Sequence, residues 1–126
     1  MPIYNYNTQI QPPAPLVYLQ VGAPETQDFI SIPALLDTGA DMTMLPASAF
    51  AALQLKHGDE VEIEGATGLT EIIGVSVVQI AIRGLPPVNL AVGNLNLETY
   101  SIVGRDYLNR YRISFDGPNL KLLIEE

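Results

Sequence analysis

Short apolar stretches separated by glycine and proline recur along most of the chain. Stretches of this length between turn residues are typical of β-strands. Residues 60–64 alternate strictly between glutamate and an aliphatic residue, which predicts a strand with one face in water. The expected strands span residues 16–21, 29–36, 60–64, 69–74, 75–82, 88–92, 112–115 and 120–124.

Two segments show helical spacing instead. Residues 46–55 begin with proline and place two large apolar side chains on one face, as a short helix would. Residues 105–111 space apolar and aromatic side chains along one face in the same way. The pattern therefore predicts an all-β domain with two short helices over residues 16–126. Residues 1–15, rich in asparagine, glutamine and proline, are expected to form a loose N-terminal arm.

Composition narrows the possible functions. The chain has 126 residues, of which 48% are hydrophobic, enough to bury a core and unlike a disordered segment. Its net charge of -8 argues against nucleic acid or an anionic membrane as a partner, because phosphate binding needs basic residues. The absence of cysteine and the single histidine exclude disulfides, thiol chemistry and multi-histidine metal sites. The sequence has neither a signal-peptide pattern nor a membrane-length apolar run, so we expect a soluble, cytoplasmic protein without metal or cofactor.

The segment with the most chemical content follows the second expected strand. Two leucines lead into Asp37, Thr38 and Gly39. The acid can act on water, the hydroxyl can bond a backbone across a close contact, and the glycine lets another backbone approach. The same residue types also form ordinary β-turns, so the tripeptide alone leaves a plain turn open as an interpretation.

A second motif changes this balance. Residues 101–108, Ser-Ile-Val-Gly-Arg-Asp-Tyr-Leu, place two apolar residues and a glycine before the second expected helix. Together with residues 37–41, Asp-Thr-Gly-Ala-Asp, and in the same order along the chain, they resemble the retropepsin-like aspartic proteases. The resemblance covers most of the chain and is nearer to the cellular and bacterial relatives than to the viral enzymes. It implies a retropepsin-like acid protease barrel with a flap hairpin, acting as a C2 homodimer.

The resemblance also assigns roles to residues of this chain. Asp37 would be the catalytic aspartate, and Thr38 and Gly39 would support the active-site loop. Asp41 would form a structural ion pair with Arg105. The residues implied to contact substrate are Gly39, Ala40, Asp41, Ala66, Thr67, Ile102 and Val103.

The implied function is that of an aspartic endopeptidase, which hydrolyses polypeptide substrates with an activated water and prefers hydrophobic residues around the cleaved bond. This chemistry needs two close carboxylates that share one proton. The chain carries one Asp-Thr-Gly and is too short for a duplicated, two-lobed form, so a homodimer with Asp37 from each subunit is predicted. A catalytically silent dimerisation or binding module on the same fold is the alternative.

Three further features have simple interpretations. Glu60, Glu62 and Glu64 share one face of the expected flap, which favours a solvated surface over a metal site. His57 lies in a polar turn after the first expected helix and is interpreted as solvated. Asp106 stands in the first turn of the second expected helix, where a carboxylate favours the helix, and it receives no catalytic role.

Overall fold

The computed structural model describes residues 2–56, 58–65, 68–95 and 99–126. Within these residues seven strands form one sheet and three form another. The larger sheet contains β2 (Leu16–Gly22), β3 (Ile30–Leu36), β4 (Met44–Pro46), β5 (Asp59–Glu64), β6 (Thr70–Ile82), β7 (Val88–Leu95) and β8 (Ser101–Val103). The smaller sheet contains β1 (Ile3–Asn5), β9 (Arg112–Asp116) and β10 (Lys121–Glu125). The two short helices are α1 (Ala47–Ala52) and α2 (Arg105–Leu108).

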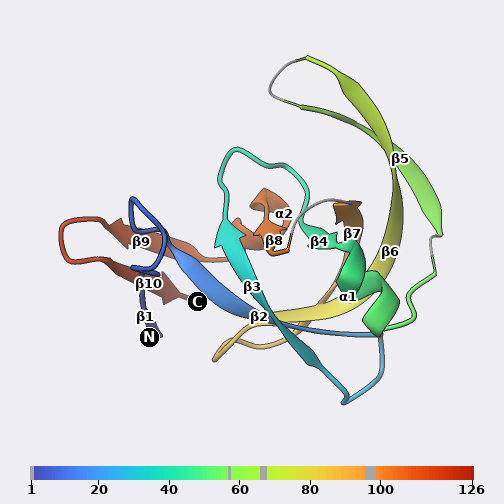
Figure 1. Ribbon diagram of the computed structural model, residues 1–126. Helices are drawn as coiled ribbons and strands as arrows, with labels where there is room; N and C mark the ends of the chain where they lie inside the picture. Colours follow the sequence, from blue (N-terminus) through green and yellow to red (C-terminus); the bar gives the residue numbers. More distant parts are fainter. Residues whose placement is uncertain (1, 57, 66–67, 96–98) are drawn as a thin grey trace.

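The larger sheet closes into a barrel. Its strands pair in the order β2-β3-β8-β4-β7-β6, and β6 pairs in turn with β2. Among the described residues β5 pairs with β6 alone, and the two form a long hairpin that rises away from the barrel (Figure 1). The expected all-β barrel with a hairpin and two short helices is confirmed.

Alternation along the strands fills the barrel. β2 buries Val17, Leu19 and Val21 and exposes the residues between them. Each fully buried aliphatic side chain of this size stabilises the fold by about 1.5–3 kcal/mol. The aromatic part of the core includes Tyr107 of α2, whose hydroxyl oxygen accepts a hydrogen bond from the N–H of Ile82 at 3.1 Å. Burial raises the pKa of Tyr107 above its ordinary value.

The strand β6 corrects one expectation from the sequence. The residue pattern predicts two strands, over residues 69–74 and 75–82, whereas β6 runs without a break through both. It changes partners at Val75: the residues before Val75 pair with β5 in the hairpin, and those after it pair with β7 in the barrel. The first half is mostly exposed and the second mostly buried. The resulting change of composition makes one long strand look like two.

The N-terminal segment corrects another. β1 pairs antiparallel with β10, with Ile3 opposite Leu123. The Tyr4 hydroxyl donates to the backbone carbonyl of Arg83, and further along the arm residues 7 and 14 exchange two backbone hydrogen bonds of 2.8 and 3.1 Å. The arm is therefore not loose over these residues. Its first strand, β1, also pairs the backbone groups along one edge of β10, which would otherwise lack partners.

Both helices are shorter than expected. α1 begins after Pro46 and ends at Ala52, and Gln54 takes a left-handed conformation with φ of 53°. That conformation stops the helix although the residue types around it allow helix. α2 ends at Leu108 and is followed directly by a turn.

Candidate active site

The loop after β3 holds Asp37 in a fixed place. The N–H of Asp37 donates to the carbonyl of Val103 at 3.0 Å, and its own carbonyl accepts from the N–H of Ala40 at 3.1 Å. One carboxylate oxygen, Oδ1, accepts from the N–H of Gly39 at 2.9 Å. Asp37 is partly exposed, and Thr38 and Gly39 are exposed. The carboxylate is thus oriented by its own loop and remains accessible to water and to another molecule.

The second motif packs directly beneath this loop. β8 runs parallel to β3, with Ile102 beside Leu35 and Val103 beside Leu36. Gly104 then passes so close to the loop that a Cβ there would lie 2.8 Å from the backbone carbon of Met42. The structure therefore brings the two sequence motifs, which are far apart in the chain, into one unit.

Arg105 bonds within this unit but not to the expected partner. Its Nη1 donates to the carbonyl of Thr38 at 2.8 Å. Asp41 and Arg105 line the same groove, yet the only ion pair recorded among the described residues joins Arg112 and Glu125, at 3.9 Å. The expected Asp41–Arg105 ion pair is replaced by an arginine contact that reaches the loop one residue after Asp37. The long arginine side chain can reach either acceptor, so sequence spacing could not decide between them.

Asp106 does more in the structure than the sequence suggested. Its carboxylate accepts two hydrogen bonds from Thr43, one from the backbone N–H at 2.9 Å and one from the hydroxyl at 2.7 Å. The Thr43 oxygen accepts in turn from the N–H of Gly104 at 3.1 Å. A threonine without an assigned role, close to the first motif, was the only sequence signal for this contact.

Apolar side chains lie outside the barrel core along the strand that leads into Asp37. The side chains of β3 alternate, so that Leu36 is buried in the barrel while Leu35 lies on the other face and is partly exposed. Ile102 lies next to Leu35 in register and is also only partly buried, whereas Val103, the other expected substrate contact of β8, is fully buried in the core. A hollow with mostly apolar walls is lined by Leu35, Tyr100 and Ile10 of the N-terminal segment. The sequence motifs predicted none of these last three residues at the site.

A groove separates the Asp37 loop from the long hairpin. Gly39, Ala40 and Asp41 line it from the loop, and Ile63 and Glu64 line it from β5. The groove therefore has the Asp37 loop on one side and β5 of the hairpin on the other. Two of the expected substrate contacts, Ala66 and Thr67, lie outside the described residues. His57, which was interpreted as solvated, also lies outside them.

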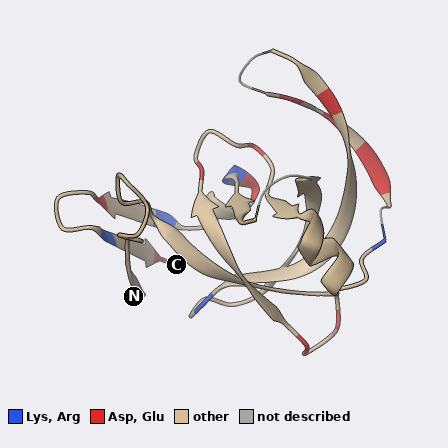
Figure 2. Cartoon of the chain, in the orientation of Figure 1, with Lys and Arg blue, Asp and Glu red and all other residues tan. Residues whose placement is uncertain are grey.

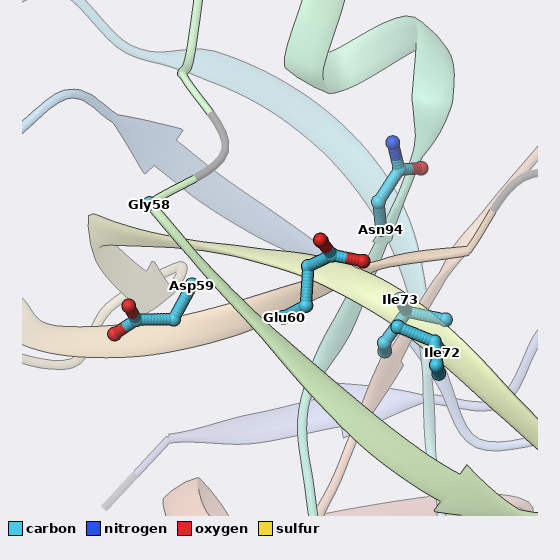
Figure 3. A pocket seen from close by; sticks show the side chains of 7 residues that line it. Gly58, Asp59, Glu60, Ile72, Ile73 and Asn94 are labelled. Carbon is cyan, nitrogen blue, oxygen red and sulfur yellow. The ribbon is translucent and has the colours of Figure 1, made fainter.

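Acidic residues recur along the long hairpin (Figure 2). Glu60, Glu62 and Glu64 are all exposed, and no cluster of three or more potential metal ligands occurs in the part of the chain that the structure describes. Figure 3 shows a separate hollow at the base of the hairpin, where Asp59 and Glu60 leave β5 in opposite directions. Its lining comes mainly from β5, β6 and β7, so it does not include the Asp37 loop.

The closed barrel, the Asp-Thr-Gly loop seated on an apolar-apolar-Gly strand, and the hairpin above the groove define a retropepsin-like aspartic protease fold. A model of the gag-polyprotein putative aspartyl protease family matches residues 28–110. The chain belongs to this family. From here we call the β5–β6 hairpin the flap.

Solved structures support the same fold. A retropepsin-like aspartic protease from Rickettsia conorii superposes with a TM-score of 0.64 at 16% identity, over 98% of this chain and 88% of that one. The EIAV protease, solved with an inhibitor, superposes with a TM-score of 0.58 at 21% identity, over 85% of this chain and 93% of that one. The retroviral protease-like domain of Ddi1 from Leishmania major superposes with a TM-score of 0.55 at 17% identity, over 88% of this chain and 89% of that one.

A search of curated protein sequences finds no significant match. Among the described residues, no helix is long and apolar enough to cross a membrane.

Proposed function

We propose that this chain is an aspartic endopeptidase that acts as a C2 homodimer, with Asp37 of each subunit at the symmetry axis. The observation that carries the proposal is the position of Asp37. Its carboxylate is oriented by the Gly39 N–H and stays partly exposed, on the loop that lines the groove. One chain supplies one such carboxylate, and two-fold symmetry brings a second identical one to the same place.

The two carboxylates would divide the chemistry between them. Like charges this close share one proton, so one group is ionised and the other is protonated; aspartic proteases are a standard example of this division. The ionised carboxylate takes a proton from a water molecule, whose oxygen then bonds to the peptide carbonyl carbon. The protonated carboxyl gives its proton to the carbonyl oxygen. When the carbon–nitrogen bond breaks, the leaving nitrogen takes the proton that the first carboxylate removed from the water. A hydroxyl of the tetrahedral intermediate returns its proton to the second carboxylate as the acid and amine products form, so the pair again shares one proton.

The residues around Asp37 would hold the dimer and the substrate. The exposed Thr38 is available to bond the partner subunit's loop, and its carbonyl is fixed by Arg105. Gly39 and Ala40 would offer backbone groups to an extended peptide, and Asp41 lies further along the same side of the groove. Ala66 and Thr67, between β5 and β6 in the sequence, stay a prediction as substrate contacts.

The walls of the site favour apolar substrate side chains next to the cleaved bond. Leu35 and Ile102 are partly exposed neighbours on the β3–β8 pair, just before the Asp37 loop, and Val103 is buried in the core. A charged side chain placed against this wall would lose water without gaining a partner. Replacing the residues that flank a cleaved bond with Asp or Lys is expected to lower kcat/KM by at least about tenfold. An unchanged rate would contradict this preference.

The deciding experiment uses a diverse peptide mixture from about pH 3 to about pH 8, with products identified by mass spectrometry. The wild type is compared with Asp37→Asn, and with Asp28→Asn as a matched control on an exposed turn away from the groove. We expect cleavage by the wild type and the control, and a loss of at least about a thousandfold in Asp37→Asn. Equal cleavage by all three proteins would refute a role for Asp37. No cleavage by a folded wild-type dimer would favour the binding module.

A further inference from the structure

We propose that Asp106 is a positioning residue that fixes the far end of the Asp37 loop through Thr43. The inference rests on the proposed function, because this loop carries the proposed catalytic carboxylate. Asp106 lies in α2, and Thr43 immediately precedes β4, 63 residues earlier in the chain. Among the described residues, Asp106 neither lines the groove nor hydrogen-bonds Asp37, and its side-chain contact with the loop is the one to Thr43.

Every polar group of Thr43 has a partner. Its N–H and its hydroxyl both donate to Asp106, at 2.9 and 2.7 Å, and its hydroxyl oxygen accepts from the N–H of Gly104 at 3.1 Å. Its carbonyl accepts from the N–H of Gly93 in β7, also at 3.1 Å. Thr43 is fully buried, so water cannot replace a partner that is lost. Thr43 thereby joins α2, β7 and the turn before α2 to the end of the active-site loop.

Hydrogen bonds of two kinds connect the loop to residues 103–106. Two are backbone bonds: the Asp37 N–H donates to Val103, and the Arg105 N–H donates to the carbonyl of Ala40 at 2.9 Å. Near the start of the loop, the Arg105 side chain also donates to the carbonyl of Thr38. The Asp106–Thr43 pair holds the other end, after the loop has turned back toward β4. Because Asp106 contacts Thr43 through its side chain, this connection can be changed by mutation without altering the backbone.

A carboxylate suits this place because it accepts two hydrogen bonds and donates none. In Asp106→Asn, the amide oxygen can still accept from the Thr43 N–H, but the amide NH2 then faces the Thr43 hydroxyl. The hydroxyl oxygen can accept that bond together with the one from Gly104. Its own proton is then left without an acceptor in a buried place. Asparagine is therefore expected to hold the loop only in part.

The test compares four full-length variants with the wild type. Thr43→Val keeps the shape of the side chain and removes its hydroxyl, Thr43→Ser keeps the hydroxyl, and Asp106→Asn changes the acceptor. Tyr107→Phe is the matched control, because it removes another buried hydrogen bond from the same helix, the one to Ile82 in the barrel. Sedimentation and urea unfolding give the fraction of folded dimer in each sample.

The first readout is amide hydrogen exchange, which does not depend on activity. We expect exchange at the Asp37 and Arg105 amides to be about tenfold faster in Asp106→Asn and Thr43→Val than in the control. In Tyr107→Phe the increase should instead appear at Ile82. Protection at Asp37 and Arg105 that equals the control in both variants would overturn the proposal.

The second readout is kinetic and is expressed per folded dimer. We expect kcat to fall about 10- to 100-fold in Thr43→Val, with KM changed less than about threefold, because the reacting carboxylate is misplaced while the groove is kept. Thr43→Ser should recover most of the loss, and Asp106→Asn should lie between them. Loss of stability without loss of kcat would overturn the proposal. If the wild type cleaves no peptide, the proposed function fails, and amide exchange alone decides whether Asp106 positions the loop.

Discussion

Gly104 lies against the backbone of Met42 so closely that a Cβ on Gly104 would be 2.8 Å from the Met42 carbonyl carbon and 2.9 Å from its oxygen. The carbonyl oxygen of Ala40 would be 3.0 Å away. These are backbone atoms of the Asp37 loop, so they cannot move aside as a side chain can. The absence of a side chain at residue 104 is what lets the strand β8 lie directly under the loop.

Gly104→Ala is therefore expected to destabilise the protein by about 1–3 kcal/mol, as overpacking does in a closely packed core. Urea unfolding followed by circular dichroism measures the loss. Gly117→Ala is the control, because a Cβ there meets nothing within 4 Å, and its effect should stay within about 0.5 kcal/mol. Equal stabilities of the two variants would mean that the loop can move away from Gly104 at little cost.

The proposed dimer makes a quantitative prediction about mixed subunits. If each active site needs Asp37 from both chains, a dimer of one wild-type and one Asp37→Asn chain is inactive. After equal amounts of the two proteins exchange subunits, about one quarter of the dimers carry two wild-type chains. Activity should then be about one quarter of that of wild type at the same total concentration. A value of one half would show that each chain acts alone.

The strands with regular alternation could be predicted from the sequence, and so could the two motifs of the site. Residues 60–64 form β5 with only a one-residue difference at its start, because the period of two survives on a half-exposed strand. The residue pattern does not predict β4 and β8, since three residues are too few to show a period. Their pairing depends on the neighbouring strands and not on their own residue types.

The side-chain partners in the site could not be predicted for a related reason. Arg105 and Asp106 are adjacent in sequence, yet Arg105 bonds Thr38 and Asp106 bonds Thr43. Both contacts join residues more than 60 positions apart, so they depend on how α2 is placed over the loop. A family motif indicates which residues meet in space but leaves open which atoms bond.

Because Tyr107 is buried, we expect the stability of the protein to change at alkaline pH. Burial raises its pKa in the folded protein, whereas the unfolded chain loses this proton near pH 10. Above about pH 10 the folded state therefore binds more protons than the unfolded state, and stability falls as pH rises. In Tyr107→Phe the decline should be less steep, by up to about 1.4 kcal/mol per pH unit. Urea unfolding of both proteins between about pH 8 and about pH 11.5 measures the two slopes. Parallel curves would contradict the assignment.

The close contact at Gly93 leads us to expect that substitutions in the flap and in β7 affect stability together. A Cβ at Gly93 would lie 2.4 Å from Cδ1 of Ile73 and 3.4 Å from the sulfur of Met42. Ile73 is a buried residue of β6 in the part of that strand that pairs with the flap strand β5. Gly93→Ala should therefore push the Ile73 side chain away and destabilise the protein by about 1–3 kcal/mol.

The matching change is Ile73→Val, which deletes the one carbon that the new methyl group would meet most closely. Alone it should cost about 0.5–1.5 kcal/mol. In the double variant the methyl group introduced by Gly93→Ala occupies the space that Cδ1 has left, so the two losses should not add. We expect the double variant to be at least about 1 kcal/mol more stable than the sum of the single losses predicts. Additive losses would show that a shift of the backbone relieves the clash. The base of the flap should then move in Gly93→Ala, and KM should change with it.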